Sequence, residues 1–113
     1  MKINIKKGGD LVTPALEEYI EKKFAPLAKY IKHFDETGVA EIWFEMSRTT
    51  EHHKKGDVYY AAADLRLPGK ILRAEETTGD AHSAVDAVKD KLHMEIEKYK
   101  TKSSDKRRGG REE

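Results

Sequence analysis

The spacing of apolar residues changes twice along this chain, and these two changes limit the folds that it can adopt. Apolar residues recur every three or four positions over residues 16–31 and again over residues 85–99, as in helices with one buried face. Polar and apolar residues alternate at the start of the chain and between the two helical segments, as in strands. The predicted order is therefore β-α-β-β-β-α. It favours an α+β two-layer sandwich with two helices packed on one face of a four-stranded sheet.

Local signals place the ends of these elements. Strands are expected at residues 2–6, 39–46, 57–67 and 70–77. Pro68-Gly69 predicts a tight turn between the last two strands. Thr13 and Asp80 are typical helix N-caps. Pro26 removes the hydrogen bond to the carbonyl of Lys22, so we expect a kink in the first helix at this point.

The sheet face and the helix stripes supply one set of candidate core residues. The expected core side chains are Leu16, Ile20, Phe24, Leu27 and Ile31 on the first helix, Ala40, Ile42, Phe44, Met46, Tyr59, Ala61, Ala63, Leu65 and Leu67 on the strands, and Val85, Val88, Leu92, Ile96 and Tyr99 on the second helix. A length of 113 residues fits one domain with one such core. We expect this domain to cover residues 1–100. The polar, charged tail 101–113 lacks apolar periodicity and is predicted to be disordered.

Several classes of protein are excluded or disfavoured by composition. The chain has no cysteine, which excludes disulfides and thiolate metal sites. It begins without an apolar run of signal-peptide length, and no stretch could span a bilayer, so we expect a cytoplasmic protein without a membrane partner. The motifs of hydrolases, P-loop proteins and dinucleotide-binding proteins are absent, and we expect neither catalysis nor a cofactor.

The polar segment 50–57, TEHHKKGD, raises the question of a metal site. Adjacent residues such as His52 and His53 seldom converge on one ion, and the other histidines lack metal-ligand spacing. We therefore expect no metal here. The neighbouring Lys54 and Lys55 favour a basic loop.

Lysines form ordered rows on both predicted helices, although the formal net charge of the chain is only +1. The helical repeat brings Lys22 and Lys29 together opposite the core stripe, with Lys23 beside the stripe. On the second helix, Lys91 and Lys98 share one flank with Lys102. Ordinary solubility explains any single lysine. Two rows, a basic loop and an arginine-bearing tail together favour a partner with a phosphate backbone.

The sheet face that the helices leave open carries a rival signal. Trp43 and Tyr60 are expected there beside Arg66 and Arg73, and exposed aromatic rings near arginines can stack on single-stranded bases. Cross-strand packing or a dimer interface is the interpretation that we favour for these side chains.

Three motifs resemble one protein family. Residues 18–30 read EYIEKKFAPLAKY, against the family pattern E-Y-x-x-K-K-x-x-x-L-x-K-Y. Residues 67–75, LPGKILRAE, resemble its L-P-G-G-x-L-R-A-E hairpin, and residues 80–92, DAHSAVDAVKDKL, resemble its last helix. The family is that of the ribosome hibernation promoting factors, also called ribosome-associated translation inhibitors or protein Y, and the chain resembles its short forms.

The resemblance implies a function through binding alone. A protein of this family occupies the tRNA and mRNA path at the decoding centre of the small ribosomal subunit, and thereby stops translation during stress or stationary phase. The implied partners are the small subunit and the whole ribosome, through phosphates of ribosomal RNA, and we expect the free protein to be a monomer. The RNA-binding residues are expected to be Lys22, Lys23, Lys29, Lys54, Lys55, Lys91, Lys98 and Lys100, of which Lys54 and Lys55 are our own inference from the basic loop.

The chain departs from the family pattern at several positions. Basic residues are common in the family at the positions of Pro26, Met94 and Glu97, and a tyrosine at that of His82. The lost cations should weaken binding to RNA. Two alternatives remain, a double-stranded RNA-binding module and a domain that dimerises through Trp43 and Tyr60. The first usually has lysines at the start of its last helix, where this chain has none before Lys89.

Overall fold

The computed structural model describes residues 1–6, 11–32, 40–49 and 58–112, and the order of its elements confirms the fold expected from the sequence. The four strands are β1 (Lys2–Ile5), β2 (Glu41–Thr49), β3 (Val58–Leu67) and β4 (Lys70–Thr78). The helices are α1 (Pro14–Phe24), the 3₁₀ helix η1 (Ala25–Tyr30) and α2 (Ala81–Glu112). The expected ends of the strands are correct to within a few residues.

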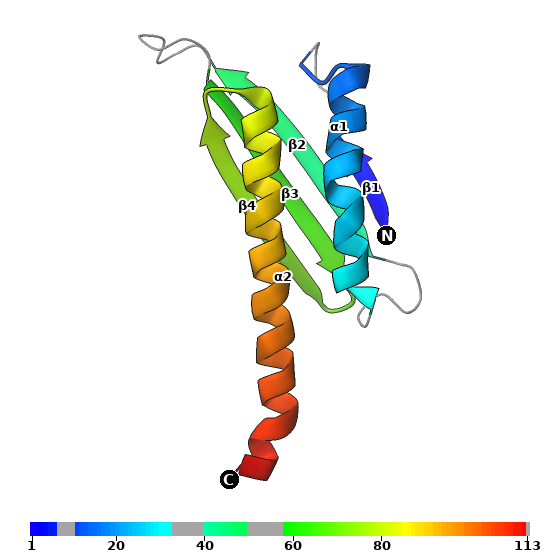
Figure 1. Cartoon of the computed structure of the whole chain (residues 1–113), viewed down its shortest axis with the longest axis vertical. Coiled ribbons are helices and arrows are strands. Elements are labelled where there is room, and N and C mark those ends of the chain that lie inside the picture. The colour runs from blue at the N-terminus through cyan, green and yellow to red at the C-terminus, as the bar shows by residue number, and fades with distance from the viewer. Residues whose placement is uncertain (7–10, 33–39, 50–57, 113) are drawn as a thin grey trace.

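The sheet has the strand order β1-β2-β3-β4, with β1 parallel to β2 and the other pairs antiparallel. A parallel pair needs a crossover connection, and α1 supplies it across one face of the sheet. Both helices lie on this face, and both run in the same direction, from the upper to the lower end of Figure 1. Both helices therefore end toward the lower side of the view, and α2 continues well beyond the end of η1.

The core lies between the helices and the sheet. Nearly all side chains expected to form it are buried, and Tyr59 and Tyr99 are partly buried at its edge. Phe24 and Phe44 meet at its centre with ring centroids 5.6 Å apart. Beneath α2, Ala63 on β3 is paired with Ala74 on β4. Both alanines are buried, and their small side chains leave room for the helix to pack close to the sheet.

The expected helix caps are present. The backbone N–H of Leu16 donates to Thr13 Oγ1 at 3.1 Å, and that of Ser83 donates to Asp80 Oδ2 at 2.8 Å. These hydrogen bonds satisfy backbone donors that have no partner within the helix. The bond from Ser83 also stabilises the ionised carboxylate, so the pKa of Asp80 lies below its ordinary value.

Pro26 changes the type of the first helix, because it has no backbone N–H to donate. The α-helical segment ends at Phe24, and the chain continues as the 3₁₀ helix η1 with the proline in its first turn. Leu27 and Ile31 remain fully buried despite the change. The disruption expected from the sequence is therefore a change of helix type that keeps the apolar stripe facing the sheet.

The second helix is longer than the sequence analysis expects. Its backbone is helical to Glu112, whereas the loss of apolar periodicity predicts a disordered tail over residues 101–113. An apolar stripe reports packing against the sheet, so its loss does not by itself mark the end of a helix. The boundary near residue 100 between the expected domain and its tail stays a prediction. Within the described residues, no helix combines the length and apolar character needed to cross a bilayer.

Candidate nucleic-acid interface

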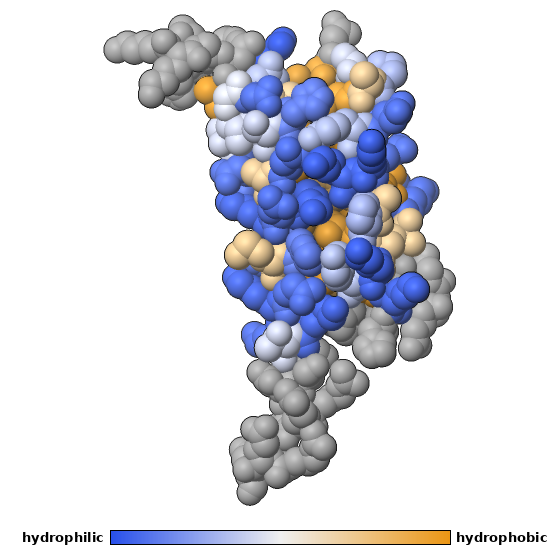
Figure 2. All heavy atoms as spheres, viewed as in Figure 1, coloured by the Kyte–Doolittle hydropathy of each residue, from blue (hydrophilic) through white to orange (hydrophobic). Residues whose placement is uncertain are grey.

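The two helices carry their charges in the same order. In the first helical segment the acidic residues 17, 18 and 21 precede the basic residues 22, 23, 29 and 32. In α2 and its N-cap, acids predominate over residues 80–90, whereas residues 91–102 hold four lysines and two glutamates. Because α1 and α2 run in parallel, the basic part of each segment follows its acidic part in the same direction along the helix layer. The helix-bearing face is mostly hydrophilic in Figure 2.

One group of charged side chains lies at the seam between the helices. The hydroxyl of Tyr19 donates to Asp86 Oδ1 at 2.6 Å, and Lys23 Nζ lies 3.5 Å from the same oxygen. The ring of His82 meets that of Tyr19 edge to face, with centroids 4.5 Å apart. The hydrogen bond to the carboxylate of Asp86 raises the pKa of Tyr19. Lys23 is therefore part of an internal network.

A second group lies further along the seam, and we call it the Tyr30 cluster: Lys29, Tyr30, His93, Glu97 and Lys100. The rings of Tyr30 and His93 have centroids 4.2 Å apart. Lys29 Nζ lies 5.1 Å and Lys100 Nζ lies 5.8 Å from the centroid of the Tyr30 ring. One tyrosine therefore holds lysines from two different elements within cation–π distance.

The two seam groups repeat the same arrangement. A tyrosine of the first helical segment, a histidine of α2 and an acid one turn after it recur at a spacing of eleven residues, which is about three helical turns. The sequence contained this signal in Tyr19 and Tyr30 and in His82 and His93. Sequence reasoning missed it, since each residue lies beside an apolar stripe and its partner lies on another helix.

The outer flank of α2 carries the remaining lysine row. Lys91 Nζ lies 3.0 Å from Glu76 Oε2 and donates to the backbone carbonyl of Glu75 at 3.2 Å. The ion pair lowers the pKa of Glu76. Lys98 Nζ lies 3.4 Å from Glu95 Oε2 on the same helix. The predicted row is present, and its first two members are paired with acids.

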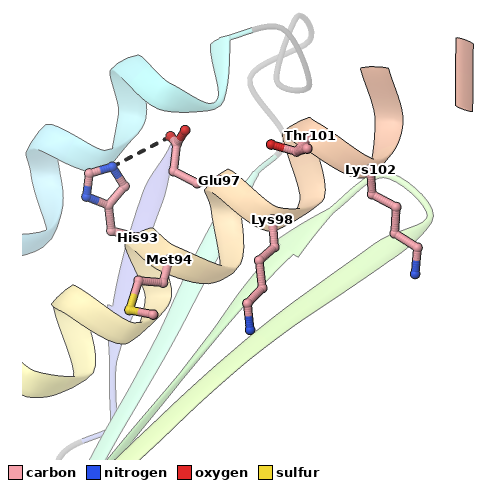
Figure 3. A pocket seen from close by; sticks show the side chains of 6 residues that line it. All are labelled: His93, Met94, Glu97, Lys98, Thr101 and Lys102. Atoms are coloured by element: carbon pink, nitrogen blue, oxygen red, sulfur yellow. Dashed lines mark ion pairs between the residues drawn. The ribbon is translucent and has the colours of Figure 1, made fainter. Parts of the chain in front are cut away.

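Figure 3 shows the end of this row around a shallow groove. Lys98 and Lys102 extend from the same side of α2, and His93 and Glu97 extend from the opposite side. Met94, which is 58% exposed, also lines the groove. In the part of the chain that the structure describes, neither Lys102 nor Lys22 has an ion-pair partner.

The structure therefore divides the expected RNA-binding residues into sets. Lys23, Lys29 and Lys100 lie at the seam, and Lys91 and Lys98 lie on the outer flank of α2. Lys22 is exposed on α1. The expected contacts of Lys54 and Lys55, like the metal question at His52-His53, fall outside the described residues. No three potential metal ligands come together among the residues that are described.

The open sheet face shows the cross-strand packing that we favoured. The guanidinium of Arg66 lies 5.1 Å from the ring centroid of Trp43, which is 41% exposed. Arg73 donates to Asp64 at 2.7 Å and to the hydroxyl of Tyr60 at 3.2 Å. Arg66 and Arg73 are thus engaged within the face, and the bond to Asp64 raises the pKa of Arg73.

Comparisons with known proteins identify the family of this chain. The model of the family described as "Sigma 54 modulation protein / S30EA ribosomal protein" matches residues 3–104. Proteins named ribosome hibernation promotion factor are similar in sequence. That of Lactococcus lactis subsp. cremoris is 33% identical over 96% of this chain and 54% of its own length. That of Bacillus subtilis is 32% identical over 90% of this chain and 50% of its own length.

The chain spans about half the length of these two relatives. A ribosome hibernation promoting factor of Acinetobacter guillouiae is nearer in size, with 29% identity over 88% of both chains.

Solved structures share the fold. A ribosomal subunit interface protein of Coxiella burnetii superposes with a TM-score of 0.70 at 24% identity, covering 89% of this chain and 99% of its own. The N-terminal domain of Thermus thermophilus protein Y gives a TM-score of 0.58 at 23% identity, covering 87% and 94%. The resemblance inferred from the three motifs is confirmed, and the chain belongs to the Sigma 54 modulation protein / S30EA ribosomal protein family, which includes the ribosome hibernation promotion factors.

Proposed function

We propose that this protein is a cytoplasmic ribosome hibernation factor that binds the small subunit as a monomer and occupies the tRNA and mRNA path at the decoding centre. Its relatives are named for ribosome hibernation, and its family match spans most of the chain. Occupancy of this path stops translation without a chemical step. Neither a cofactor nor a metal is needed for such a mechanism.

The observation that carries the proposal is the gathering of lysines on the helix-bearing face. Parallel packing of the helices brings the seam lysines and the outer row of α2 toward one end of that face. Lysines that neutralise RNA phosphates release counterions, which favours binding and makes it sensitive to salt. The balanced net charge of the chain does not oppose this, since the field near one face depends on local charge.

The acidic partners of these lysines are compatible with RNA binding. The pair of Lys91 with Glu76 and the pair of Lys98 with Glu95 are solvent-exposed. Exposed ion pairs contribute only about 0–1 kcal/mol each. A polyanion that contacts several lysines can therefore replace such intramolecular pairs.

Sedimentation with purified ribosomes tests the proposal. The protein should move with small subunits and whole ribosomes at low salt, should be released as salt is raised, and should be blocked by prebound tRNA. Protein that stays at the top of the gradient at low salt would contradict ribosome binding. Binding that is unaffected by prebound tRNA would contradict the location at the decoding centre.

A pair of charge-reversed variants tests the face. Lys91→Glu with Lys98→Glu should weaken binding by about tenfold or more and reduce its salt dependence. Lys2→Glu with Lys6→Glu makes the same change of charge in β1 and at the residue that follows it, and Lys6 borders the open sheet face beside Trp43. This control should bind nearly as the parent does. Equal losses in both variants would mean that net charge, rather than the helix face, determines binding. Thermal unfolding should show that both variants remain folded.

A further inference from the structure

Glu97 holds an unusual position within the Tyr30 cluster. Its carboxylate oxygen Oε2 lies 3.6 Å from His93 Nε2 and 3.8 Å from Lys100 Nζ. Both groups thus lie within 4 Å of this oxygen, and both also contact Tyr30. An anionic oxygen thus already occupies the space in which a bound phosphate would meet the same donors.

We propose that the Tyr30 cluster is a phosphate-binding subsite that Glu97 occupies in the free protein as an internal competitor. The side chain of Glu97 is 52% exposed, so it can swing into solvent when a phosphate enters. Lys100, His93 and Lys29 then face the phosphate group. The inference rests on the proposed function, in which the incoming group is a phosphate of ribosomal RNA.

Tyr30 is the positioning residue of this subsite. Lys29 belongs to η1 and Lys100 to α2, and both ammonium groups lie within 6 Å of the same ring centroid. The ring therefore restrains two flexible side chains that would otherwise repel each other. Because the side chains of Lys29 and Lys100 are already restrained, binding one phosphate with both of them costs less conformational entropy. Residue spacing within one helix could not predict this pair, because its members come from two elements.

The chain contains a matched control for Glu97. Glu95 pairs with Lys98 at 3.4 Å with the same spacing of three residues as the pair of Glu97 with Lys100. Glu95 contacts neither Tyr30 nor a histidine in the described structure. Glu95→Gln and Glu97→Gln each add one unit of positive net charge to the same helix. A difference in affinity between the two variants therefore reports the effect of the Tyr30 cluster alone.

The first measurement is the affinity for small ribosomal subunits. Glu97→Gln should bind about three- to fivefold more tightly than the parent, the size expected when one exposed competing ion pair is removed. Glu95→Gln should bind nearly as the parent does. Tyr30→Leu should abolish the gain from Glu97→Gln, whereas Tyr30→Phe, which keeps the ring, should retain it.

The second measurement separates the subsite from the proposed function. Titration with inorganic pyrophosphate, followed by NMR of the lysine side chains, should shift the signals of Lys29 and Lys100 in Glu97→Gln more than in Glu95→Gln. If this difference appears but ribosome binding is absent, the subsite stands and the proposed partner is wrong. Equal affinities and equal shifts for the two glutamine variants would contradict the proposal that Glu97 is an internal competitor of phosphate.

Discussion

At the scale of single residues, the two seam groups differ in how fully they are internally paired. The carboxylate of Asp86 accepts a hydrogen bond from Tyr19 and also pairs with Lys23. Tyr30 has its ring in contact with His93, and no hydrogen bond from its hydroxyl is seen among the described residues. The first group therefore contributes a polar link between the helices, and the second leaves its lysines more available to a ligand.

Removal of the two tyrosine hydroxyls should separate these roles. Tyr19→Phe loses the hydrogen bond to Asp86 and should lower the free energy of unfolding by about 1 kcal/mol. Tyr30→Phe should leave it nearly unchanged. Urea denaturation at neutral pH measures both variants. Equal losses would show that the bond from Tyr19 contributes no net stability.

The pKa of Tyr19 adds a dependence on pH. Because this pKa is raised above its ordinary value of 10.0, the folded state favours the protonated phenol. The resulting stability is fully present below pH 10.0 and is lost as the pH rises through the folded pKa. The difference in unfolding free energy between the parent and Tyr19→Phe should therefore shrink at alkaline pH. A constant difference up to strongly alkaline pH would contradict this.

At the scale of elements, Pro26 determines the form of the first helical segment. It ends α1 and begins η1 while the apolar stripe stays buried. From the family resemblance of the sequence, we expect a basic residue at this position. The proline therefore combines a backbone effect with the absence of a cation.

Two substitutions separate these effects. Pro26→Ala and Pro26→Lys both restore a backbone N–H. Circular dichroism should therefore show at least as much α-helix in each variant as in the parent. Only Pro26→Lys adds a charge, and it should bind small subunits about two- to fivefold more tightly than Pro26→Ala. Equal affinities would exclude this position from the interface.

The N-cap of α2 gives a prediction for acid conditions. The pKa of Asp80 is lowered because its carboxylate accepts the N–H of Ser83. Its stabilising effect is present above the ordinary value of 3.8 and is lost as the pH falls through the folded pKa. Asp80→Asn keeps a capping oxygen that does not titrate in this range. The parent should lose more stability than this variant on acidification, as judged by thermal unfolding. Parallel pH profiles would exclude the cap as a source of acid sensitivity.

At the scale of the whole molecule, the core and the extended part of α2 are separate in sequence. Among the side chains of α2 whose burial the structure describes, up to Lys102, the last fully buried one is Ile96, and Tyr99 is only partly buried. The helix continues to Glu112 beyond this point. The stability of the sandwich should therefore depend little on the end of the helix.

Truncation tests this separation. A chain that ends at Lys102 should keep its free energy of unfolding within about 0.5 kcal/mol of the parent, as expected when no core contact is lost. Leu92→Ala, which removes a fully buried side chain, should cost about 2–5 kcal/mol in the same urea experiment. A large loss on truncation would place residues after Lys102 within the cooperative fold.

The sequence by itself determined the order of the elements, the caps at Thr13 and Asp80, the hairpin turn and the core stripes. These features depend on interactions between neighbours in the chain, and local periodicity records them. The family motifs are also local, so the resemblance could be recognised before the fold was known. The apolar pattern reports packing against the sheet, so it contained no information on how far α2 continues beyond the core.

Only the tertiary structure decided which charges meet. Lys29 and Lys100 share one ring, and Lys23 pairs with Asp86, because the parallel helices lie side by side on the sheet. A helical wheel gives the direction of a side chain on its own helix, but it contains neither the separation nor the register of two helices. The lysine rows were therefore visible in the sequence, and the Tyr30 cluster required the packed fold.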